Sequence, residues 1–342
     1  MYNKPRTFCP GLFILQGSRD EETIISYGGV PMRKEDIYFE SRDGATKLHA
    51  IIWSDEKKSP VGILQIIHGM AEYIDRYDDF AKYMVGKGYV VVGNDHLGHG
   101  DSVGENGTYG YFCKKDPATV LVRDAHRLKK IMEGKYPGVP YYILGHSMGS
   151  FVARNYLCRY GSGIQGMIVM GTGNQSKALL RVSKMIAGIT GFFCGDKKVA
   201  KMINKLAFGT YNRAIENPKT NVDWLSKDED IVEKYIMDER CGFTFTVNGF
   251  KGLFELIYRL QKPKNFVNIP RKIPVFFVSG EEDPVGDYGE GVIHAKNALV
   301  KAGLENVSMK LYPGDRHEIL NETDREVVYN DIYEWLDSLK QV

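Results

Sequence analysis

One serine of the sequence stands in a turn that could make it a nucleophile. Ser147 is the centre of a G-x-S-x-G pattern that begins at Gly145, directly after the apolar run 141–144, and ends at Gly149. Where a strand turns tightly into a helix, this pattern exposes the serine hydroxyl at the positive end of the helix. A tight turn without chemistry is the alternative, so Ser147 needs partners elsewhere in the chain.

Candidate partners for Ser147 occur late in the chain. A serine needs a base, usually histidine, and an anionic side chain must hold that imidazole in the required tautomer. On such a turn the order along the chain is serine, acid, histidine. Asp283 follows the apolar run 273–279, and His317 lies after the run 307–312. We therefore predict that Ser147, Asp283 and His317 act together.

Other residues could fill the acid and base roles. After Ser147, only His294 competes with His317, and it falls inside a predicted helix. The other candidate acids lie close by: Glu281, Glu282 and Asp315. Asp283 is preferred because it best matches the turn at the carboxyl end of a strand, where open sheets of this kind bind ligands. Taken singly, it would be read as an ordinary turn aspartate.

Two backbone amides are predicted to stabilise the oxygen that becomes negative during acyl transfer. Each such donor contributes on the order of 3–4 kcal/mol to the transition state. One is the amide of Met148, directly after the nucleophile. The second is the amide of Met70, in the loop after the apolar run 61–67, where Gly69 lets the backbone come close.

Strands and helices that could position these residues alternate along the chain. Apolar runs predict strands over 37–42, 46–53, 61–67, 89–93, 141–144, 164–170, 273–279 and 307–312. Helical spacing of apolar residues predicts helices over 75–87, 116–135, 148–160, 289–302 and 323–339. The order predicts an α/β fold with a mostly parallel sheet, right-handed crossovers and helices on both faces.

The alternation stops over residues 172–262. Four helical patterns follow one another there, over 178–190, 196–207, 226–237 and 246–261, and Met and Phe are frequent. Such a long interruption favours an inserted helical cap over a pair of ordinary packing helices. The predicted core is therefore 32–171 and 263–342. Residues 1–31 lack clear periodicity, and we predict a leader or extension outside the core.

Composition disfavours several classes of function. The chain has 45 basic and 43 acidic residues, a net charge of +2, which does not suggest nucleic acid as a partner. Its five cysteines are widely spaced without a C-x-x-C pattern, which indicates free thiols in a reducing compartment such as the cytoplasm. The eight histidines form no metal-binding pattern, and we predict neither a metal nor a cofactor.

Five separated motifs together resemble the monoacylglycerol lipase/lysophospholipase branch of the α/β-hydrolase superfamily. They are HGMAEY at 68–73, DHLGHGDS at 95–102, GHSMG at 145–149, GEEDPVG at 280–286 and YPGDRHEILNE at 312–322. The resemblance runs from about residue 34 to the end of the chain. It implies an α/β-hydrolase fold and hydrolysis of a small-molecule ester with one acyl chain by Ser147, Asp283 and His317. It also implies that the cap shapes an acyl-binding pocket and that the 95–102 loop is chiefly structural.

Met70 departs from this branch, in which small residues are frequent at that position. A backbone donor tolerates any side chain, so the predicted role of the Met70 amide stands. The side chain of Met70 is expected to narrow the predicted acyl-binding site. The Met- and Phe-rich cap is also expected to make transient contact with a lipid surface.

Competing interpretations use the same fold. A peptidase that resembles proline iminopeptidases would need an anionic site for a substrate amino group, and the acidic run 228–230 of the cap offers one. Acyl transfer to an alcohol would use the same acyl-enzyme. A non-catalytic binding protein is the alternative from another class. Haloalkane dehalogenases and epoxide hydrolases carry aspartate at the position that Ser147 occupies, which disfavours them.

Overall fold

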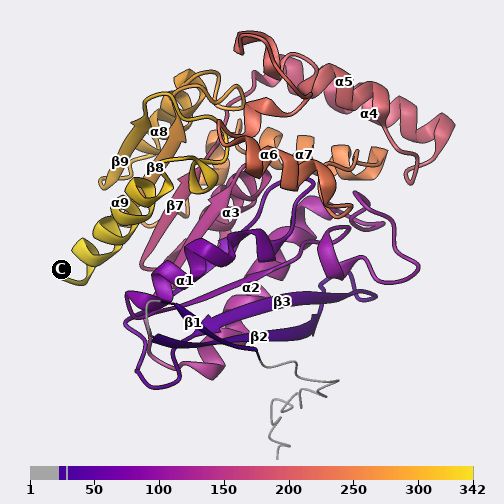
Figure 1. Ribbon diagram of the computed structural model, residues 1–342. Coiled ribbons are helices and arrows are strands. Elements are labelled where there is room, and N and C mark those ends of the chain that lie inside the picture. The colour runs from indigo at the N-terminus through magenta and orange to yellow at the C-terminus, as the bar shows by residue number, and fades with distance from the viewer. Residues whose placement is uncertain (1–22, 28–29, 342) are drawn as a thin grey trace, which may run out of the picture.

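The computed structural model describes residues 23–27 and 30–341. Nine strands in this part of the chain form one sheet, with helices packed around it (Figure 1). The strands are β1 Thr23–Tyr27, β2 Val30–Glu40, β3 Lys47–Ser54, β4 Gly62–Ile67, β5 Tyr89–Asn94, β6 Tyr141–His146, β7 Gly166–Met170, β8 Val275–Gly280 and β9 Val307–Tyr312. Their spatial order is β1-β2-β3-β5-β4-β6-β7-β8-β9.

The sheet is mixed but mostly parallel, as the sequence predicts. β1, β2, β3 and β5 pair antiparallel in turn, and every pair from β5 to β9 is parallel. All six residues of β4, β5, β6 and β8 are buried. Such continuous burial is typical of parallel strands that are covered on both faces.

Helices cover both faces of this sheet. They are α1 Asp78–Gly86, α2 Pro117–Lys135, α3 Met148–Tyr160, α8 Glu290–Lys301 and α9 Arg325–Ser338. Helices α2, α3 and α8 share one hydrophobic core with alternate strand residues such as Ile63 and Ile143. Helices α1 and α9 share the other core with the intervening residues, such as Leu64 and Leu144. The predicted α/β class is therefore confirmed.

A helical insertion separates β7 from β8. Its helices are α4 Lys177–Cys194, α5 Lys201–Phe208, α6 Glu229–Met237 and α7 Val247–Arg259, with short 3₁₀ turns η4 Tyr211–Ala214 and η5 Asp223–Leu225. Helix α7 packs against α2 and α3, and α4 lies along α7. Figure 1 shows α4 and α5 at the top of the view, far from β1–β3.

Two predicted helices of the insertion begin later than expected. The helix predicted over 196–207 starts only at Lys201, because Gly195 ends α4 at a φ of 85° and Val199 forms a bridge with Thr246. The helix predicted over 226–237 starts at Glu229, after Asp228 caps the amides of residues 230 and 231. A side-chain cap of this kind sets where a helix begins.

The amino-terminal region lies partly outside the described residues, which exclude 1–22 and 28–29. Residues Thr23–Tyr27 form β1, which pairs antiparallel with β2 at the edge of the sheet. Strand β2 begins at Val30, two residues before the predicted start of the core. Among the described residues, no helix is long and apolar enough to cross a membrane.

Candidate active site

Ser147 occupies a strained turn between β6 and α3. Its φ of 52° and ψ of −120° lie in a region that non-glycine residues rarely adopt. Its amide donates a 3.0 Å hydrogen bond to the carbonyl oxygen of Met170 at the end of β7. The side chain is partly exposed, whereas its neighbours along the chain are buried. The serine therefore stands at the carboxyl end of the sheet, at the start of a helix.

Glycine is required on both sides of this turn. A Cβ atom on Gly149 would lie 1.9 Å from the carbonyl oxygen of Ile67 in β4. A Cβ atom on Gly145 would lie 2.5 Å from the carbonyl oxygen of Gly149. Both separations are far below van der Waals contact, so any side chain would push α3 away from the sheet.

Asp283 and His317 meet at hydrogen-bond distance. His317 Nδ1 lies 2.9 Å from Asp283 Oδ2, and both side chains are almost fully buried. The other carboxylate oxygen of Asp283 accepts a 2.8 Å bond from the amide of Val285, and Ser279 Oγ donates to Oδ2 at 3.2 Å. A carboxylate only accepts, so Nδ1 carries a proton and donates this hydrogen bond, and Nε2 is the ring nitrogen that is not bonded to the acid.

The end of β7 brings Ser147 and His317 to one place. Ser147 is bonded to Met170, and the next residue is Gly171. A Cβ atom on Gly171 would lie 3.1 Å from His317 Cε1. The alternative residues lie elsewhere: His294 is exposed on α8, Glu281 and Glu282 are exposed, and Asp315 pairs with Lys227 at 2.8 Å.

Both predicted backbone donors lie beside the serine. Met148 is the first residue of α3, so its amide has no acceptor within the helix. A Cβ atom on Gly69 would lie 3.0 Å from Ser147 Cβ, which shows how closely the loop before Met70 approaches. The Met70 amide has no acceptor among the described residues.

The sequence analysis did not predict a buried ionic network that includes His146, the residue before Ser147. Arg76 forms a two-bond pair with Glu318 at 2.8 and 2.7 Å and contacts Glu72 at 3.0 Å. His146 Nδ1 lies 3.2 Å from Glu72 Oε1, and its Nε2 donates to the carbonyl oxygen of His317 at 3.3 Å. The network thus reaches the backbone of the proposed base. Only the four-residue spacing of Glu72 and Arg76 hinted at it in the sequence.

The pKa shifts of Glu72 and His146 have the directions expected when an acidic and a basic side chain are hydrogen-bonded to each other. Burial alone would raise the pKa of Glu72, but hydrogen bonding and the positive charges of His146 and Arg76 hold it well below its ordinary value. Burial alone would lower the pKa of His146, but the bond to Glu72 raises it. The Nε2–H group of His146 thus links this network to the His317 backbone.

Three other buried histidines are neutral. Burial lowers the pKa of His96 to about 4 and that of His99 to about 3, and it lowers the pKa of His68 as well. The amide of His96 donates to His68 Nε2 at 3.0 Å. These rings tie the 95–102 loop to the loop before Met70.

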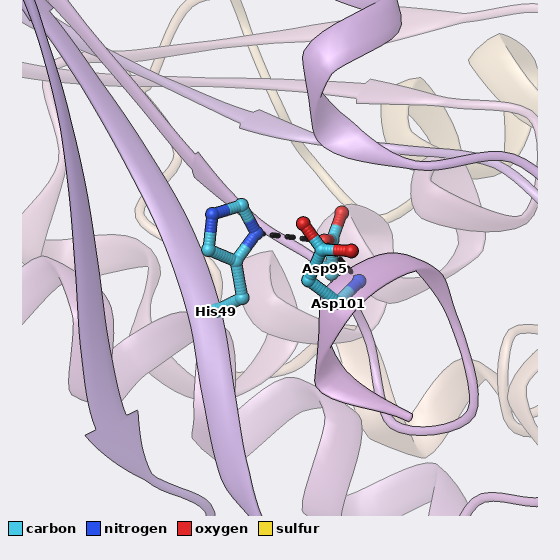
Figure 2. A group of neighbouring side chains, drawn as sticks. All are labelled: His49, Asp95 and Asp101. Carbon is cyan, nitrogen blue, oxygen red and sulfur yellow. Dashed lines mark hydrogen bonds and ion pairs between the residues drawn. The ribbon is translucent and has the colours of Figure 1, made fainter. Parts of the chain in front are cut away.

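Figure 2 shows a further group of metal-ligand residue types, His49, Asp95 and Asp101. His49 Nδ1 lies 2.8 Å from Asp95 Oδ2, and its Nε2 lies 2.6 Å from Asp36 Oδ1. Burial alone would lower the pKa of His49, but these two carboxylates raise it to about 9. An imidazolium that donates from both nitrogens has no lone pair for a metal ion. We interpret the group as an ionic link between strands.

Comparisons with known proteins agree with this fold. A family model described as serine aminopeptidase, S33, matches residues 58–324. The monoglyceride lipase homolog of Monkeypox virus is 26% identical over 280 residues, which cover 81% of this chain and 90% of that protein. The monoacylglycerol lipase of Mycolicibacterium smegmatis is 26% identical over 296 residues, which cover 86% and 94%.

A solved structure is similar at higher identity. The thermostable carboxyl esterase from Bacillus coagulans, in complex with glycerol, superposes with a TM-score of 0.83 at 31% identity. The match covers 90% of this chain and 98% of that one. The core and the helical insertion therefore both lie within a shared architecture.

Proposed function

Because the chain belongs to the serine aminopeptidase S33 family of α/β-hydrolases, we propose that it hydrolyses carboxylic esters with Ser147 as nucleophile. The family and the relatives show a serine hydrolase of the esterase and lipase kind. The observation that carries the assignment of residues is the bond between Asp283 and His317, at the sheet end where Ser147 takes its strained turn.

The proposed reaction has two steps. Ser147 Oγ attacks the ester carbonyl while His317 Nε2 takes its proton, and Asp283 stabilises the imidazolium. The amides of Met70 and Met148 donate to the oxyanion. His317 then protonates the alcohol as the ester bond breaks, which leaves the acyl group on Ser147. A water molecule, deprotonated by His317, releases the carboxylic acid and restores the serine.

Monoacylglycerols, lysophospholipids and similar esters with one acyl chain are the proposed substrates. Support comes from the names of the relatives and from the apolar character of the insertion. We propose that residues 172–262 form a cap over the acyl chain. The side chain of Met70 packs against the core that also contains residues of α7, and we propose that it narrows that site.

The outer face of the insertion supports a proposed contact with a lipid surface. Phe192 and Phe193 are 84% and 78% exposed, and α5 exposes Met202 and Leu206 by 61% and 68%. Exposed basic residues occur on the same two helices and in the connection between them: Lys177, Arg181, Lys197, Lys198, Lys201 and Lys205. Exposed apolar side chains flanked by cations are typical of surfaces that lie on membranes.

The alternatives receive less support. Two of the three acids that a peptidase would use are engaged elsewhere, since Asp228 caps α6 and Glu229 pairs with Lys219. A non-catalytic protein would have no need of the strain at Ser147. A cytoplasmic location remains part of the proposal, and the four cysteines among the described residues are free.

A panel of substrates at fixed pH tests the proposal. It compares p-nitrophenyl esters, monoacylglycerols, lysophospholipids and aminoacyl amides, with wild type and Ser147→Ala. We expect turnover of single-chain esters by the wild type and none by the folded variant. Preference for aminoacyl amides, or equal ester turnover by Ser147→Ala, would contradict it. Product analysis with added glycerol separates hydrolysis from acyl transfer.

A further inference from the structure

Residues 223–227 of the insertion, named the clamp segment, hold the loop that carries His317. Two consecutive amides of that loop donate to the clamp segment. His317 N–H bonds the carbonyl oxygen of Trp224 at 3.3 Å, and Glu318 N–H bonds that of Leu225 at 2.7 Å. These bonds restrain the backbone on both sides of the His317 Cα atom. The imidazole therefore depends on a segment outside the sheet.

Side chains strengthen the same contact. Arg316 Nη1 donates to the carbonyl oxygens of Asp223 and Ser226 at 2.8 and 3.1 Å. Lys227 Nζ lies 2.8 Å from Oδ1 of the buried Asp315. The three residues that precede Glu318 are therefore each bonded to the clamp segment.

One ring of the clamp segment lies against the imidazole itself. The centroids of the Trp224 and His317 rings are 5.2 Å apart, and their planes meet at 46°. Tyr211 packs edge-on against Trp224 at 5.0 Å, and Phe208 at the end of α5 packs against Tyr211 at 5.4 Å. A row of aromatic rings thus supports Trp224 from the side of the insertion.

The bond to Asp283 leaves one motion of the imidazole unrestrained. It fixes the direction of Nδ1, but the ring can still tilt about the line that joins the two side chains. The Trp224 ring, inclined at 46° to the imidazole, opposes that tilt together with the His146 ring, whose centroid lies 4.8 Å from that of His317. We propose that Trp224 is a positioning residue that holds His317 Nε2 toward Ser147, and this role rests on the proposed function.

Kinetics with the soluble ester p-nitrophenyl acetate test this role. Trp224→Ala should lower kcat about 10-fold or more with KM changed by less than about twofold, because misplacing a base affects the reaction more than binding. Trp224→Phe keeps a ring against the imidazole and should retain kcat within about threefold. Tyr160→Ala is the matched control, since it removes a ring stacked on His126 at 3.8 Å, and should leave both constants unchanged.

Proton NMR reports on the position of the His317 imidazole independently of catalytic activity. The Nδ1 proton of His317, bonded to Asp283, should give a downfield signal in the wild type, Trp224→Phe and Tyr160→Ala. Trp224→Ala should broaden or lose it. If Trp224→Ala does not unfold cooperatively, Trp224→Leu, which removes the ring but keeps an apolar side chain, takes its place with the same expected direction.

The outcomes separate this inference from the proposed function. An unchanged kcat and an unchanged signal in Trp224→Ala would overturn the positioning role. Loss of the signal in that variant, in a protein whose wild type hydrolyses none of the esters, would support the positioning role and refute the proposed function.

Discussion

At the scale of single residues, close backbone contact decides which side chains the serine turn tolerates. Gly149→Ala should lower the free energy of unfolding by about 1–3 kcal/mol, because its Cβ would lie 1.9 Å from the Ile67 carbonyl oxygen. Urea unfolding measures the change. Gly134→Ala in α2 is the control, since a Cβ there meets nothing within 4 Å, and it should not destabilise the protein. Equal stability of Gly149→Ala and wild type would contradict the geometry.

Substitution of Asp283 and of the nearby acid Glu281 tests which of them serves as the acid of the proposed triad. Asp283→Asn should lower kcat on the order of 10⁴-fold, because an amide no longer selects the required tautomer of His317. Glu281→Gln, an exposed acid two residues away, should leave kcat unchanged. Ester hydrolysis by the two purified variants measures both. If Glu281→Gln caused the loss and Asp283→Asn did not, the acid would be misassigned.

Candidate site residues could be predicted from the sequence where the chemistry requires a fixed order of residue types along the chain. Ser147, Asp283 and His317 could be selected because each follows a predicted strand in a required order. The ion pair of Arg76 and Glu318 could not, because its residues are 242 positions apart and only folding brings them together. The contact of Trp224 with His317 could not be predicted from the sequence for the same reason.

At the scale of elements, an ionic link joins β2, β3 and the loop after β5. The pKa of His49 is raised to about 9 from an ordinary value of 6.5 by the bonds to Asp36 and Asp95. The protonated form is therefore the one that the fold stabilises. This contribution is complete below about pH 6.5 and is lost as the pH rises through about 9, and it amounts to on the order of 3 kcal/mol.

Chemical unfolding between pH 6 and 10 measures this link. The free energy of unfolding of the wild type should fall over that range, and the fall should be smaller in His49→Gln. His294→Gln, which changes an exposed histidine of α8, should keep the wild-type slope. If the free energy of unfolding fell equally with pH in His49→Gln and in the wild type, the proposed stabilisation by protonated His49 would be contradicted.

The outer face of α4 and α5 predicts binding to lipid vesicles. Replacing Phe192 and Phe193 together by Ser should weaken binding to vesicles that contain anionic phospholipid by about 10-fold or more, since two large apolar side chains no longer enter the interface. Co-sedimentation measures it. Val267→Ser removes a side chain that is 79% exposed outside the insertion helices and serves as the control. Unchanged binding of the Phe variant would refute the contact.

Element types could be predicted more securely than element boundaries. The α/β alternation and the helical insertion follow from apolar periodicity, which the structure confirms. The start of α5 depends on Gly195 and on the bridge between Val199 and Thr246, which are 47 positions apart. No local pattern reports such a contact, so the predicted helix began too early.

At the scale of the whole molecule, the proposed site depends on both the sheet and the insertion. Ser147 and Asp283 follow the ends of β6 and β8, and the loop of His317 is hydrogen-bonded to the clamp segment of the insertion. The spatial order β3-β5-β4-β6 could not be derived from a single sequence, because which strands become neighbours depends on packing across the molecule. The division into core and cap remains a prediction.

The most direct test of the proposed serine chemistry is the site of reaction with a fluorophosphonate, which forms a stable adduct with activated serines. Peptide mass spectrometry of the treated protein should find one adduct, on the peptide that contains Ser147, and none in Ser147→Ala. Absence of an adduct on the folded wild type, or an adduct that persists in Ser147→Ala, would contradict the account.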